Sequence, residues 1–436
     1  MMNNDNLMEK IISLCKRRGF IFPGSEIYGG LANSYDFGPM GVLLKNNIKQ
    51  LWWKKFVLDR DDMVGLDAGI IMSTRVWEAS GHLKNFNDLL VECKKCHARY
   101  RQDDLEKKVC VSCGGKEFTQ AQNFNTMFKT NLGPVETAEN EVYLRPETAQ
   151  AMFVDFKAVL DTSRKRLPFG IAQIGKAFRN EITPGNFIFR TREFEQMEIE
   201  YFIAEKYWKK HFEQWMEEMK NWIAAVGINE NNVKFVDVPD NERAHYSKRT
   251  VDVEYKYPFG QKELYGLAYR TDYDLKAHAS HSGKDMSYTD PETNEKFVPH
   301  VIEPSLGVER TLLAVLLEAY HEEGSDKDKR VVLKLKPALA PYKVAVFPLL
   351  KNKPELVKKA REIYDDLRQQ FPTAWDDRGN VGKRYYAQDE IGTPYCITVD
   401  FDSLEDKKVT VRDRDTMKQE RVEIESLPGY LKGNLS

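Results

Sequence analysis

The sequence lacks the long apolar segments that cross membranes. Its longest apolar run, residues 311–320, is too short to span a bilayer and carries Glu318. The first ten residues lack a basic region followed by an apolar core, so no secretory signal is expected and the cytoplasm is the expected location. An excess of one charge is also lacking, because the formal net charge is −2. Any polyanionic partner must therefore be met by a local basic patch.

Cysteine is scarce, with six residues in 436, and a disulfide framework is not expected in a chain of this size. Four of the cysteines form two CxxC pairs with 13 residues between them: Cys93, Cys96, Cys110 and Cys113. Thiolates at this spacing can converge on one ion, so the sequence predicts a structural zinc site with no open position for catalysis. Four reduced cysteines without a metal are the alternative.

The apolar pattern divides the chain into parts, and 436 residues give room for two or three domains. Residues 205–226 carry large apolar side chains at helical spacing, which predicts a long helix packed on a core. Beyond Pro341 apolar strands alternate with helices, which indicates a separate small α/β domain. The candidates for a local basic patch in this domain are Arg378, Lys383, Arg384, Arg412 and Arg414.

Residues 177–202 crowd arginines, carboxylates and phenylalanines into two apolar-rich runs joined by Thr-Pro-Gly-Asn. These turn residues predict a hairpin. Because side chains alternate along a strand, one face of the first strand is expected to carry Arg179 and Glu181. The matching face of the return strand would carry Arg190, Arg192, Phe194, Gln196 and Glu198.

On this face Phe194 and Glu198 would stand roughly 13 Å apart, which is about the reach of one elongated ligand. An aromatic ring can stack on a base, a guanidinium group can bind a phosphate, and a carboxylate can hold an ammonium group. The face therefore predicts a site for an adenine, a phosphate and an amine in sequence. For any one of these residues, a solvated strand face with salt bridges is the alternative.

Six stretches, in one order along the chain, resemble a known family. Three are similar to the signature motifs one, two and three of class II synthetases: residues 35–53, 178–198 and 303–320. Three others resemble stretches typical of glycine-specific members: residues 76–82, 143–150 and 267–275. Over nearly its whole length the chain thus resembles the dimeric glycyl-tRNA synthetases, within the class II aminoacyl-tRNA synthetases.

The resemblance implies an α+β fold, with the class II antiparallel sheet flanked by helices, a zinc-binding insertion and a C-terminal α/β anticodon-binding domain. The expected catalytic domain covers residues 1–340 and the anticodon-binding domain residues 341–436. Within the first, residues 88–120 would form the zinc-binding insertion, and residues 205–300 would form the insertion between motifs two and three. Because not all members carry the cysteine pairs, the zinc prediction depends on their spacing. A homodimer is implied, with motif one at its interface.

The resemblance also implies the residues that bind ATP. Arg179 and Arg310 would be catalytic, since they would hold the α-phosphate and the terminal phosphates, and Phe194 would stack under the adenine. Mg²⁺ and polar groups of the ligands are expected at Glu263 and Glu303. The full expected ATP set is Arg179, Asn180, Glu181, Phe189, Arg190, Phe194, Glu263, Leu264, Gly307 and Arg310.

Glycine offers no side chain to bind, so its selection must come from its ammonium and carboxylate groups and from steric exclusion of larger amino acids. Several carboxylates around the ammonium group suit this task. The glycine set implied by the resemblance is Arg101, Glu147, Phe194, Glu198, Arg270, Glu303 and Ser305. His82 is interpreted as a structural histidine rather than a catalytic one.

The implied activity is ligation of glycine to the 3′ end of tRNA(Gly), through a glycyl-adenylate, with release of pyrophosphate and AMP. The expected partners are tRNA(Gly), glycine, ATP and a second copy of the chain, and no membrane. The expected cofactors are Mg²⁺ and structural Zn²⁺, with ATP as a substrate. Two alternatives are a catalytically silent synthetase-like protein that binds tRNA or a regulatory partner, and a synthetase for serine, threonine or proline.

Overall fold

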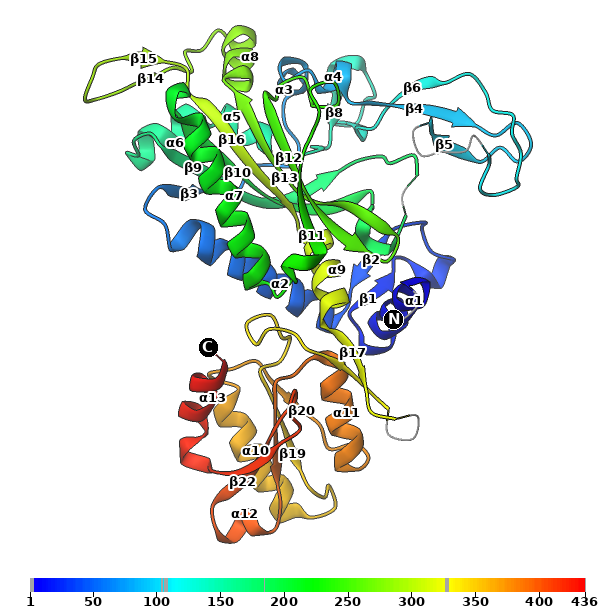
Figure 1. Cartoon of the computed structure of the whole chain (residues 1–436), viewed down its shortest axis with the longest axis vertical. Helices are drawn as coiled ribbons and strands as arrows, with labels where there is room; N and C mark the ends of the chain where they lie inside the picture. The colour runs from blue at the N-terminus through cyan, green and yellow to red at the C-terminus, as the bar shows by residue number, and fades with distance from the viewer. Residues whose placement is uncertain (1–3, 103–104, 106–108, 184, 326–328, 436) are drawn as a thin grey trace.

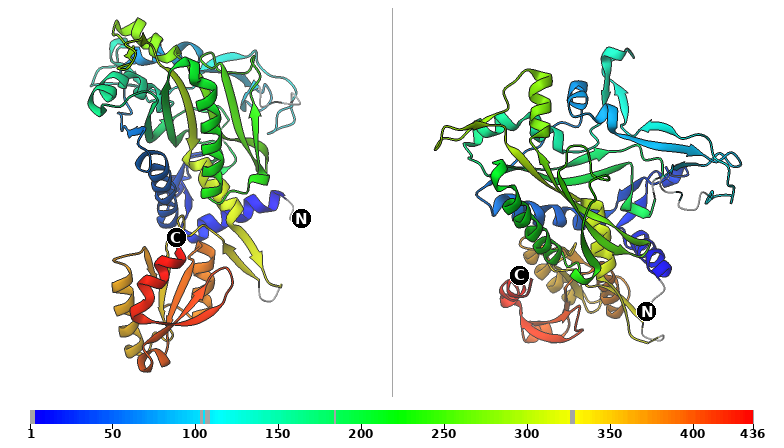
Figure 2. Two further views of the ribbon diagram at one scale, coloured as in Figure 1. Left: turned by 60° about the vertical axis from the view of Figure 1, so that its left-hand side comes forward. Right: turned by 45° about the horizontal axis from the view of Figure 1, so that its top comes forward.

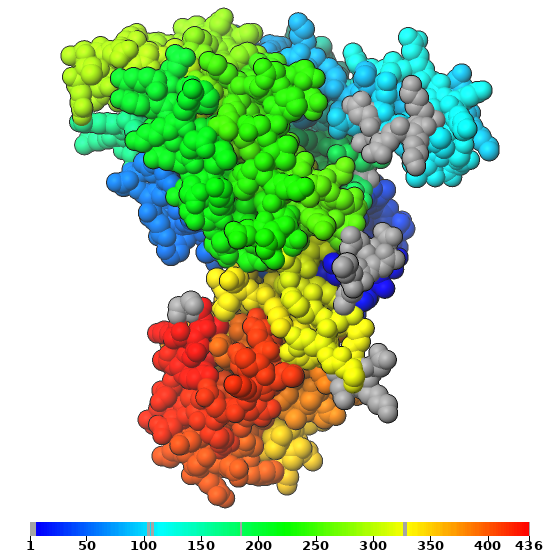
Figure 3. Space-filling model, in the orientation of Figure 1, coloured from blue at the N-terminus to red at the C-terminus, as the bar shows by residue number. Residues whose placement is uncertain are grey.

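The computed structural model describes residues 4–102, 105, 109–183, 185–325 and 329–435. These residues form a larger N-terminal part and a smaller C-terminal part, one above the other in Figure 1. Residues 320–325 and 329–340 lie at the junction between the two parts, within the yellow segment of Figure 3. Among the described residues, no helix combines the length and the apolar composition needed to cross a membrane.

A seven-stranded sheet forms the centre of the N-terminal part. Neighbouring strands are antiparallel, except for the last two in the order, which are parallel. In order across the sheet the strands are β11 (Val233–Asp237), β12 (Arg249–Tyr257), β13 (Gly260–Thr271), β16 (His300–Gly307), β10 (Glu193–Ile203), β9 (Phe169–Phe178) and β3 (Met63–Gly65).

One face of this sheet packs on helices through a large apolar core. Met197, Ile199 and Tyr201 of β10 point into this core because alternate residues of a strand share a face. The predicted long helix is confirmed, since a short 3-10 turn leads into α7, on which Trp215 and Trp222 are buried. The helical elements on this side are α1 (Asn4–Arg18), α2 (Pro39–Trp53), η2 (Lys54–Leu58), η6 (Glu205–Tyr207), α7 (Trp208–Ala225) and α9 (Val308–Ala319).

The opposite face of the sheet carries short helices that leave part of the strands uncovered (Figure 2). Of these, α5 packs on β9 and β10, and α8 packs on β13. The helices are α3 (Thr74–Ala79), α4 (His82–Asn85), α5 (Ala149–Val154), α6 (Phe156–Ser163) and α8 (Tyr273–Ser282). Paired short strands near the edges are β1 (Ile21–Pro23) with β2 (Tyr35–Phe37), β7 (Lys129–Asn131) with β8 (Glu141–Tyr143), and β14 (Tyr288–Thr289) with β15 (Lys296–Phe297).

A separate three-stranded sheet projects from the N-terminal part (Figure 1), and the first cysteine of the two pairs, Cys93, directly follows its strand β4 (Asn87–Glu92). Its strands are β5 (Arg99–Arg101), β4 and β6 (Gln122–Asn125), in that order. Its small core consists of Val91, Tyr100, Cys93 and Cys110. Since this core is small, the fold of the projection depends on what holds the cysteines together.

The C-terminal part is a five-stranded sheet with helices on its faces and a core of its own. The first three strands in the order are parallel and the others antiparallel. They are β20 (Thr373–Trp375), β19 (Val344–Pro348), β21 (Tyr395–Val399), β22 (Lys408–Asp413) and β23 (Gln419–Glu423), and the helices are α10 (Pro354–Leu367), α11 (Val381–Ile391), α12 (Asp402–Glu405) and α13 (Leu427–Leu435). The predicted alternation of strands and helices beyond Pro341 is confirmed.

A buried ionic network joins this part to the hairpin of β17 (Tyr320–Glu323) and β18 (Arg330–Leu333). Asp389 of α11 is fully buried and accepts hydrogen bonds from Arg330 at 2.8 Å and from Arg412 at 2.9 and 3.0 Å. Arg414 is buried too and donates to the carbonyl oxygens of Gly392 and Leu335. The network therefore ties the junction to the C-terminal sheet.

The prediction of a basic patch is wrong for three of its five residues, because these three are buried. Arg384, Arg412 and Arg414 are 1%, 5% and 3% exposed. Arg384 donates to backbone carbonyls, including those of Asp377 and Gly379, while the other two belong to the network described above. Buried guanidinium groups of this kind stabilise the fold and are not accessible to RNA. Arg378 and Lys383 are exposed.

Replacing Asp389 by Asn should destabilise the protein, because the buried guanidinium group of Arg412 would lose its anionic partner and that of Arg330 would keep only Glu323. We expect the free energy of unfolding to fall by roughly 3–5 kcal/mol, as when one partner of a buried ion pair is removed. Urea denaturation measures this change. Asp402→Asn, at an exposed position of the same part, is the control and should change it by less than about 0.5 kcal/mol. Equal stability of the two variants would contradict the network's role.

Candidate functional site

The hairpin of residues 177–202 differs from its prediction in where its strands end. β9 ends at Phe178 and β10 begins at Glu193, so residues 179–192 form a long loop instead of a four-residue turn. Asn186 and Phe187 have φ of 56° and 59°, and a 3-10 turn (η5, Phe187–Phe189) follows. Arg190 and Arg192 therefore precede the strand and do not belong to its face. Pro184 of the predicted turn lies outside the described residues.

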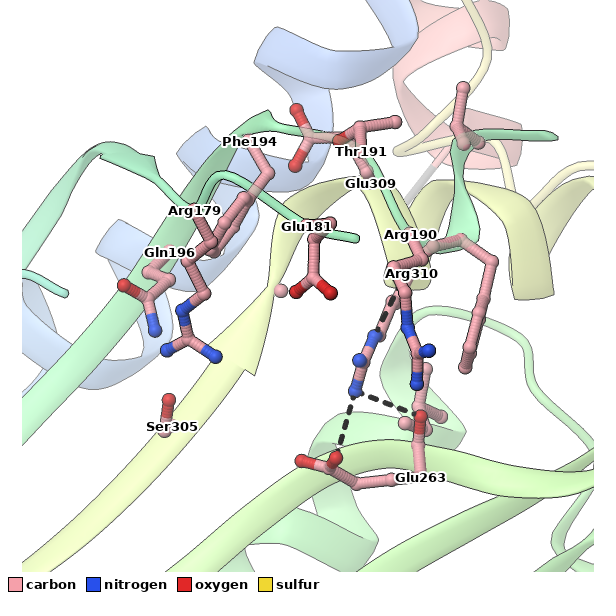
Figure 4. A pocket seen from close by; sticks show the side chains of 14 residues that line it. Arg179, Glu181, Arg190, Thr191, Phe194, Gln196, Glu263, Ser305, Glu309 and Arg310 are labelled. Atoms are coloured by element: carbon pink, nitrogen blue, oxygen red, sulfur yellow. Dashed lines mark hydrogen bonds and ion pairs between the residues drawn. The ribbon is translucent and has the colours of Figure 1, made fainter. Parts of the chain in front are cut away.

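This loop forms one wall of a pocket on the uncovered face of the large sheet (Figure 4). The other walls come from β13 and from the point where β16 passes into α9. The lining includes nine of the ten predicted ATP residues: Arg179, Glu181, Phe189, Arg190, Phe194, Glu263, Leu264, Gly307 and Arg310. Asn180 instead lines a neighbouring cavity on the other side of the loop, and its N–H donates to the carbonyl oxygen of Thr126.

At one end of the pocket, Arg310 is held in place by three contacts. Its guanidinium group lies 4.6 Å from the centre of the Phe189 ring. Its Nη1 lies 3.1 Å from the Glu263 carboxylate and donates to the Glu263 carbonyl oxygen at 3.1 Å, as the dashed lines in Figure 4 show. Arg310 lowers the pKa of Glu263, so this carboxylate stays ionised. The arrangement offers a cation and an acid side by side at the pocket rim.

In the middle of the pocket, Arg179 and Phe194 lie together. The Arg179 guanidinium group is 5.4 Å from the centre of the Phe194 ring, and its Nε donates to the carbonyl oxygen of Pro146 at 3.0 Å. Pro146 directly precedes Glu147, so Arg179 stands between the ring and the acidic residues beyond it. An aromatic ring beside a guanidinium group is suited to a base with its attached phosphate.

Beyond Arg179 the pocket reaches Gln196 and Ser305, which lead to Glu198. Ser305 donates to Glu198 at 2.6 Å, and Gln196 donates to the same carboxylate oxygen at 2.8 Å. The second oxygen of Glu198 accepts from the N–H and hydroxyl of Thr148. Glu198 is 2% exposed, so these donors stabilise a carboxylate that water hardly reaches.

Behind Glu198 lies a second set of buried polar residues centred on Arg270. Its guanidinium group pairs with both oxygens of Asp274, at 2.8 and 2.9 Å, and with Glu303 at 2.8 Å. Gln150 donates to Asp274 and to Glu147, each at 3.0 Å. Arg270 is 1% exposed and lies against the Tyr246 ring at 3.8 Å. The predicted glycine residues Glu147, Glu198, Arg270, Glu303 and Ser305 are thus neighbours.

Acidic groups outnumber cationic ones in this cluster, and their pKa values diverge. Burial, opposed by Arg270 but reinforced by nearby carboxylates, raises the pKa of Glu303 to about 8. Burial and the Glu147 charge raise the pKa of Glu198. Glu147 is also buried, but His82 lowers its pKa: His82 Nε2 lies 3.4 Å from its carboxylate and His82 Nδ1 lies 2.7 Å from the Ser80 hydroxyl. A cluster with surplus acid is suited to receive an ammonium group.

Arg101 lies apart from this cluster, on β5 of the projecting sheet. Its Nε is 3.2 Å from Asp88, and its backbone N–H donates to the Thr183 hydroxyl at 3.2 Å. It therefore contacts the long loop of the hairpin. Its role as a glycine-binding residue stays a prediction.

The four clustered cysteines meet in the projecting sheet. Their sulfur atoms all lie within 4.8 Å of one another, with Cys93 and Cys113 at 3.6 Å and Cys96 and Cys110 at 3.4 Å. A hydrogen bond from Tyr100 lowers the pKa of Cys110 to about 6, which favours a thiolate. At Gly115 a Cβ atom would lie 3.2 Å from the sulfur of Cys93, so glycine leaves room for the cluster. Four sulfur atoms in this arrangement fit a tetrahedral metal ion.

Known proteins resemble this chain over nearly its whole length. Residues 128–320 match the family model of the tRNA synthetase class II core domain (G, H, P, S and T), and residues 343–434 match that of the anticodon binding domain. The glycine–tRNA ligase of Alkaliphilus oremlandii is 53% identical over 100% of both chains. That of Caldanaerobacter subterraneus is 52% identical over 98% of both chains, and that of Bacillus anthracis 52% identical over 97% of this chain and 98% of its own.

The chain belongs to the glycine–tRNA ligase family. The predicted family, the α+β fold class with its class II core and C-terminal anticodon-binding domain, and the class of enzyme, an aminoacyl-tRNA synthetase, are confirmed. The ligase core model covers the strands β10, β13 and β16, which line the pocket, and the loop of residues 179–192. The site described above therefore lies within the family's core.

Several residues of the ligase site were missed by the sequence prediction. Gln150 and Asp274 lie in the stretches 143–150 and 267–275, which were compared with the family without being singled out. Asp274 follows Arg270 by four residues, and this spacing of opposite charges was a usable signal. Glu200 lies on the same face of β10 as Glu198 and is fully buried, and neither of its carboxylate oxygens has a hydrogen-bond partner among the described residues.

Glu200 should make the stability of the ligase depend on pH. Burial and the Glu303 charge raise its pKa in the folded protein well above the usual value. The folded state therefore binds a proton more tightly than the unfolded state, and this contribution to stability is present at low pH and is lost as pH rises through the raised pKa. We expect the free energy of unfolding of Glu200→Gln, relative to the wild type, to increase from pH 5 to pH 9.

Urea denaturation at several pH values between these limits measures that difference. Glu193→Gln, at an exposed position of the same strand, is the control and should show no such trend. A difference between Glu200→Gln and the wild type that is constant over this range would contradict the prediction.

Proposed function

We propose that this protein activates glycine with ATP to glycyl-adenylate and transfers the glycyl group to the 3′ end of tRNA(Gly), with release of pyrophosphate and AMP. The observation that carries the proposal is a single pocket in which Arg179, Phe194 and Arg310 adjoin a buried acidic cluster around Arg270. A nucleotide and an ammonium group can occupy such a site together. Family membership supports the same reaction.

ATP would lie along the pocket with its adenine on Phe194. Arg179, beside that ring, would bind the α-phosphate, and Arg310, at the rim with Arg190, would bind the terminal phosphates. The half-exposed carboxylate of Glu263 would hold Mg²⁺, which when bound neutralises phosphate charge. Glu303 fits this task less well because Arg270 already engages it.

Glycine would lie beyond Arg179, with its ammonium group among the carboxylates of Glu147, Glu198 and Glu303. Its carboxylate attacks the α-phosphorus in line and pyrophosphate leaves, so the protein's contribution is to hold both reactants and to stabilise the phosphate charge. No nucleophilic side chain is needed. Because the cluster is buried and closely packed, an amino acid with a side chain would clash with it.

In the second step the terminal ribose hydroxyl of the tRNA attacks the mixed anhydride. We infer that residues 1–340 act as the catalytic domain, in which residues 88–120 bind zinc and residues 205–300 separate motifs two and three. Residues 341–436 would bind the anticodon, in keeping with the matching domain model. We further infer a cytoplasmic homodimer in which residues 35–53 contribute to the interface, an inference supported by the similarity of those residues to motif one.

Pyrophosphate exchange tests the first step. The wild type should catalyse ATP–pyrophosphate exchange with glycine and not with serine, threonine or proline. Arg179→Ala should lower kcat/KM by roughly 100- to 1000-fold, because one donor to the developing phosphate charge is lost. Arg166→Ala is the control, since the exposed Arg166 side chain pairs only with exposed Glu292 among the described residues.

Two results would contradict the proposal. Absence of exchange with every amino acid would favour a silent relative that binds tRNA or a regulatory partner. Exchange with serine, threonine or proline instead of glycine would assign a different substrate.

We propose that the four clustered cysteines bind one structural Zn²⁺, supported by their mutual distances and by the donor set. Protein purified without added metal should contain about one equivalent of zinc per chain. Cys110→Ser should lose that zinc, as measured by elemental analysis, and should expose the projecting sheet to proteolysis. Cys15→Ser, at a buried cysteine outside the cluster, should retain it. A full zinc content in Cys110→Ser would contradict this site.

A further inference from the structure

Two buried, charged side chains outside the predicted ligand sets lie beside the nucleotide pocket. Lys45 of α2 and Glu309, in the first turn of α9, are 8% and 4% exposed. Lys45 Nζ lies 2.6 Å from Glu309 Oε1. Glu309 lines the pocket, and Figure 4 shows it behind Thr191, between Phe194 and Arg310.

The second oxygen of Glu309 completes the hydrogen bonding of β10. That strand pairs with β16 as far as Gln196 opposite Gly307, after which the chain turns into α9. On the side that faces β16, the next N–H of β10, that of Glu195, therefore has no strand to bond to, although Glu195 still stands opposite Lys176 of β9. It donates to Glu309 Oε2 at 2.8 Å instead. A buried N–H needs a partner, and a carboxylate is a strong one.

The position of this bond links the middle of the pocket to the end that carries Arg310. Glu195 directly follows Phe194, and Glu309 directly precedes Arg310. One carboxylate therefore ties the strand that presents the aromatic ring to the helix that presents the guanidinium group. If this bond were lost, the two could separate without unfolding of either element.

Lys45 stabilises the buried Glu309 carboxylate by compensating its charge. A buried charge without a partner is costly, and Lys45 supplies the opposite charge. Its Nζ also lies 3.4 Å from the Glu195 carboxylate and 4.1 Å from the centre of the Phe37 ring. These contacts from two sides fix the ammonium group, which in turn fixes Glu309.

We propose that Lys45 and Glu309 are positioning residues for ATP, which hold the adenine-stacking ring and the phosphate-binding arginine at the separation that the nucleotide requires. The proposal rests on the proposed function, since it takes ATP as the occupant of the pocket. Neither residue touches the glycine cluster through any contact among the described residues. Their loss should therefore affect ATP and not glycine.

Steady-state pyrophosphate exchange with Lys45→Met tests whether the loss affects the binding of ATP and not that of glycine. We expect the KM for ATP to rise about tenfold or more, while the KM for glycine changes by less than about twofold. Lys49→Met is the matched control, because Lys49 lies one turn further along α2 and its only ion pair among the described residues is with Glu195, at 3.1 Å. Lys49→Met should leave both KM values within about twofold of the wild type.

If Lys45→Met fails to fold because Glu309 is left unpaired, two double variants without this buried charge still test the proposal. Lys45→Met with Glu309→Gln removes both charges but keeps an acceptor for the Glu195 N–H. Lys45→Met with Glu309→Leu removes the charges and the acceptor. The Leu double variant should have a KM for ATP at least about fivefold above that of the Gln double variant.

Equal KM values for ATP in the two double variants would overturn the proposal. A parallel rise in the KM for both substrates in Lys45→Met would also overturn it, because that result indicates general damage to the fold. Wild-type protein without glycine-dependent exchange would instead refute the proposed function.

Discussion

A guanidinium group buried in the middle of the sheet, that of Arg270, is the interaction on which the acidic half of the site depends. Its bonds to Asp274 and Glu303 allow carboxylates to gather where water is excluded. Without it, Glu200 and Glu303 would lose the cation that opposes their charges, at a high cost, and Glu198 beside them would keep only the influence of Arg179. The remaining acidic surplus is what an incoming ammonium group would neutralise, so the resting cluster is poised for a cationic ligand.

The side chains of β10 alternate between the apolar core on one face of the sheet and the site on the other face. Met197, Ile199 and Tyr201 point to the helices on one face, while Phe194, Gln196 and Glu198 point to the pocket on the other. A shift of one residue in register would exchange the two sets, so the core that stabilises the sheet also orients the site. The hydrogen bond from the Glu195 N–H to Glu309 also fixes the start of α9 against this strand.

Much of the site follows from local pattern, and the rest depends on distant packing. The face shared by Phe194, Gln196 and Glu198 was predictable because strand alternation is a local rule. The loop of residues 179–192 was not, because its course is set by Phe187–Phe189 packing into the core rather than by the Thr-Pro-Gly-Asn turn. Arg384, Arg412 and Arg414 were misjudged for a related reason: each has a partner on another element of the fold, namely Pro348, Asp389 and Gly392.

By itself the sequence determined the family, the enzyme class, the α+β architecture and the cysteine pairs, because motif order, apolar periodicity and CxxC spacing are properties of the chain read in line. Only the tertiary structure decided which charges are partners. Arg270 meets Glu303 from another strand, and Lys45 meets Glu309 from a helix 264 residues away. Electrostatic energy depends on distance and burial in space, and neither quantity can be read from the order of residues.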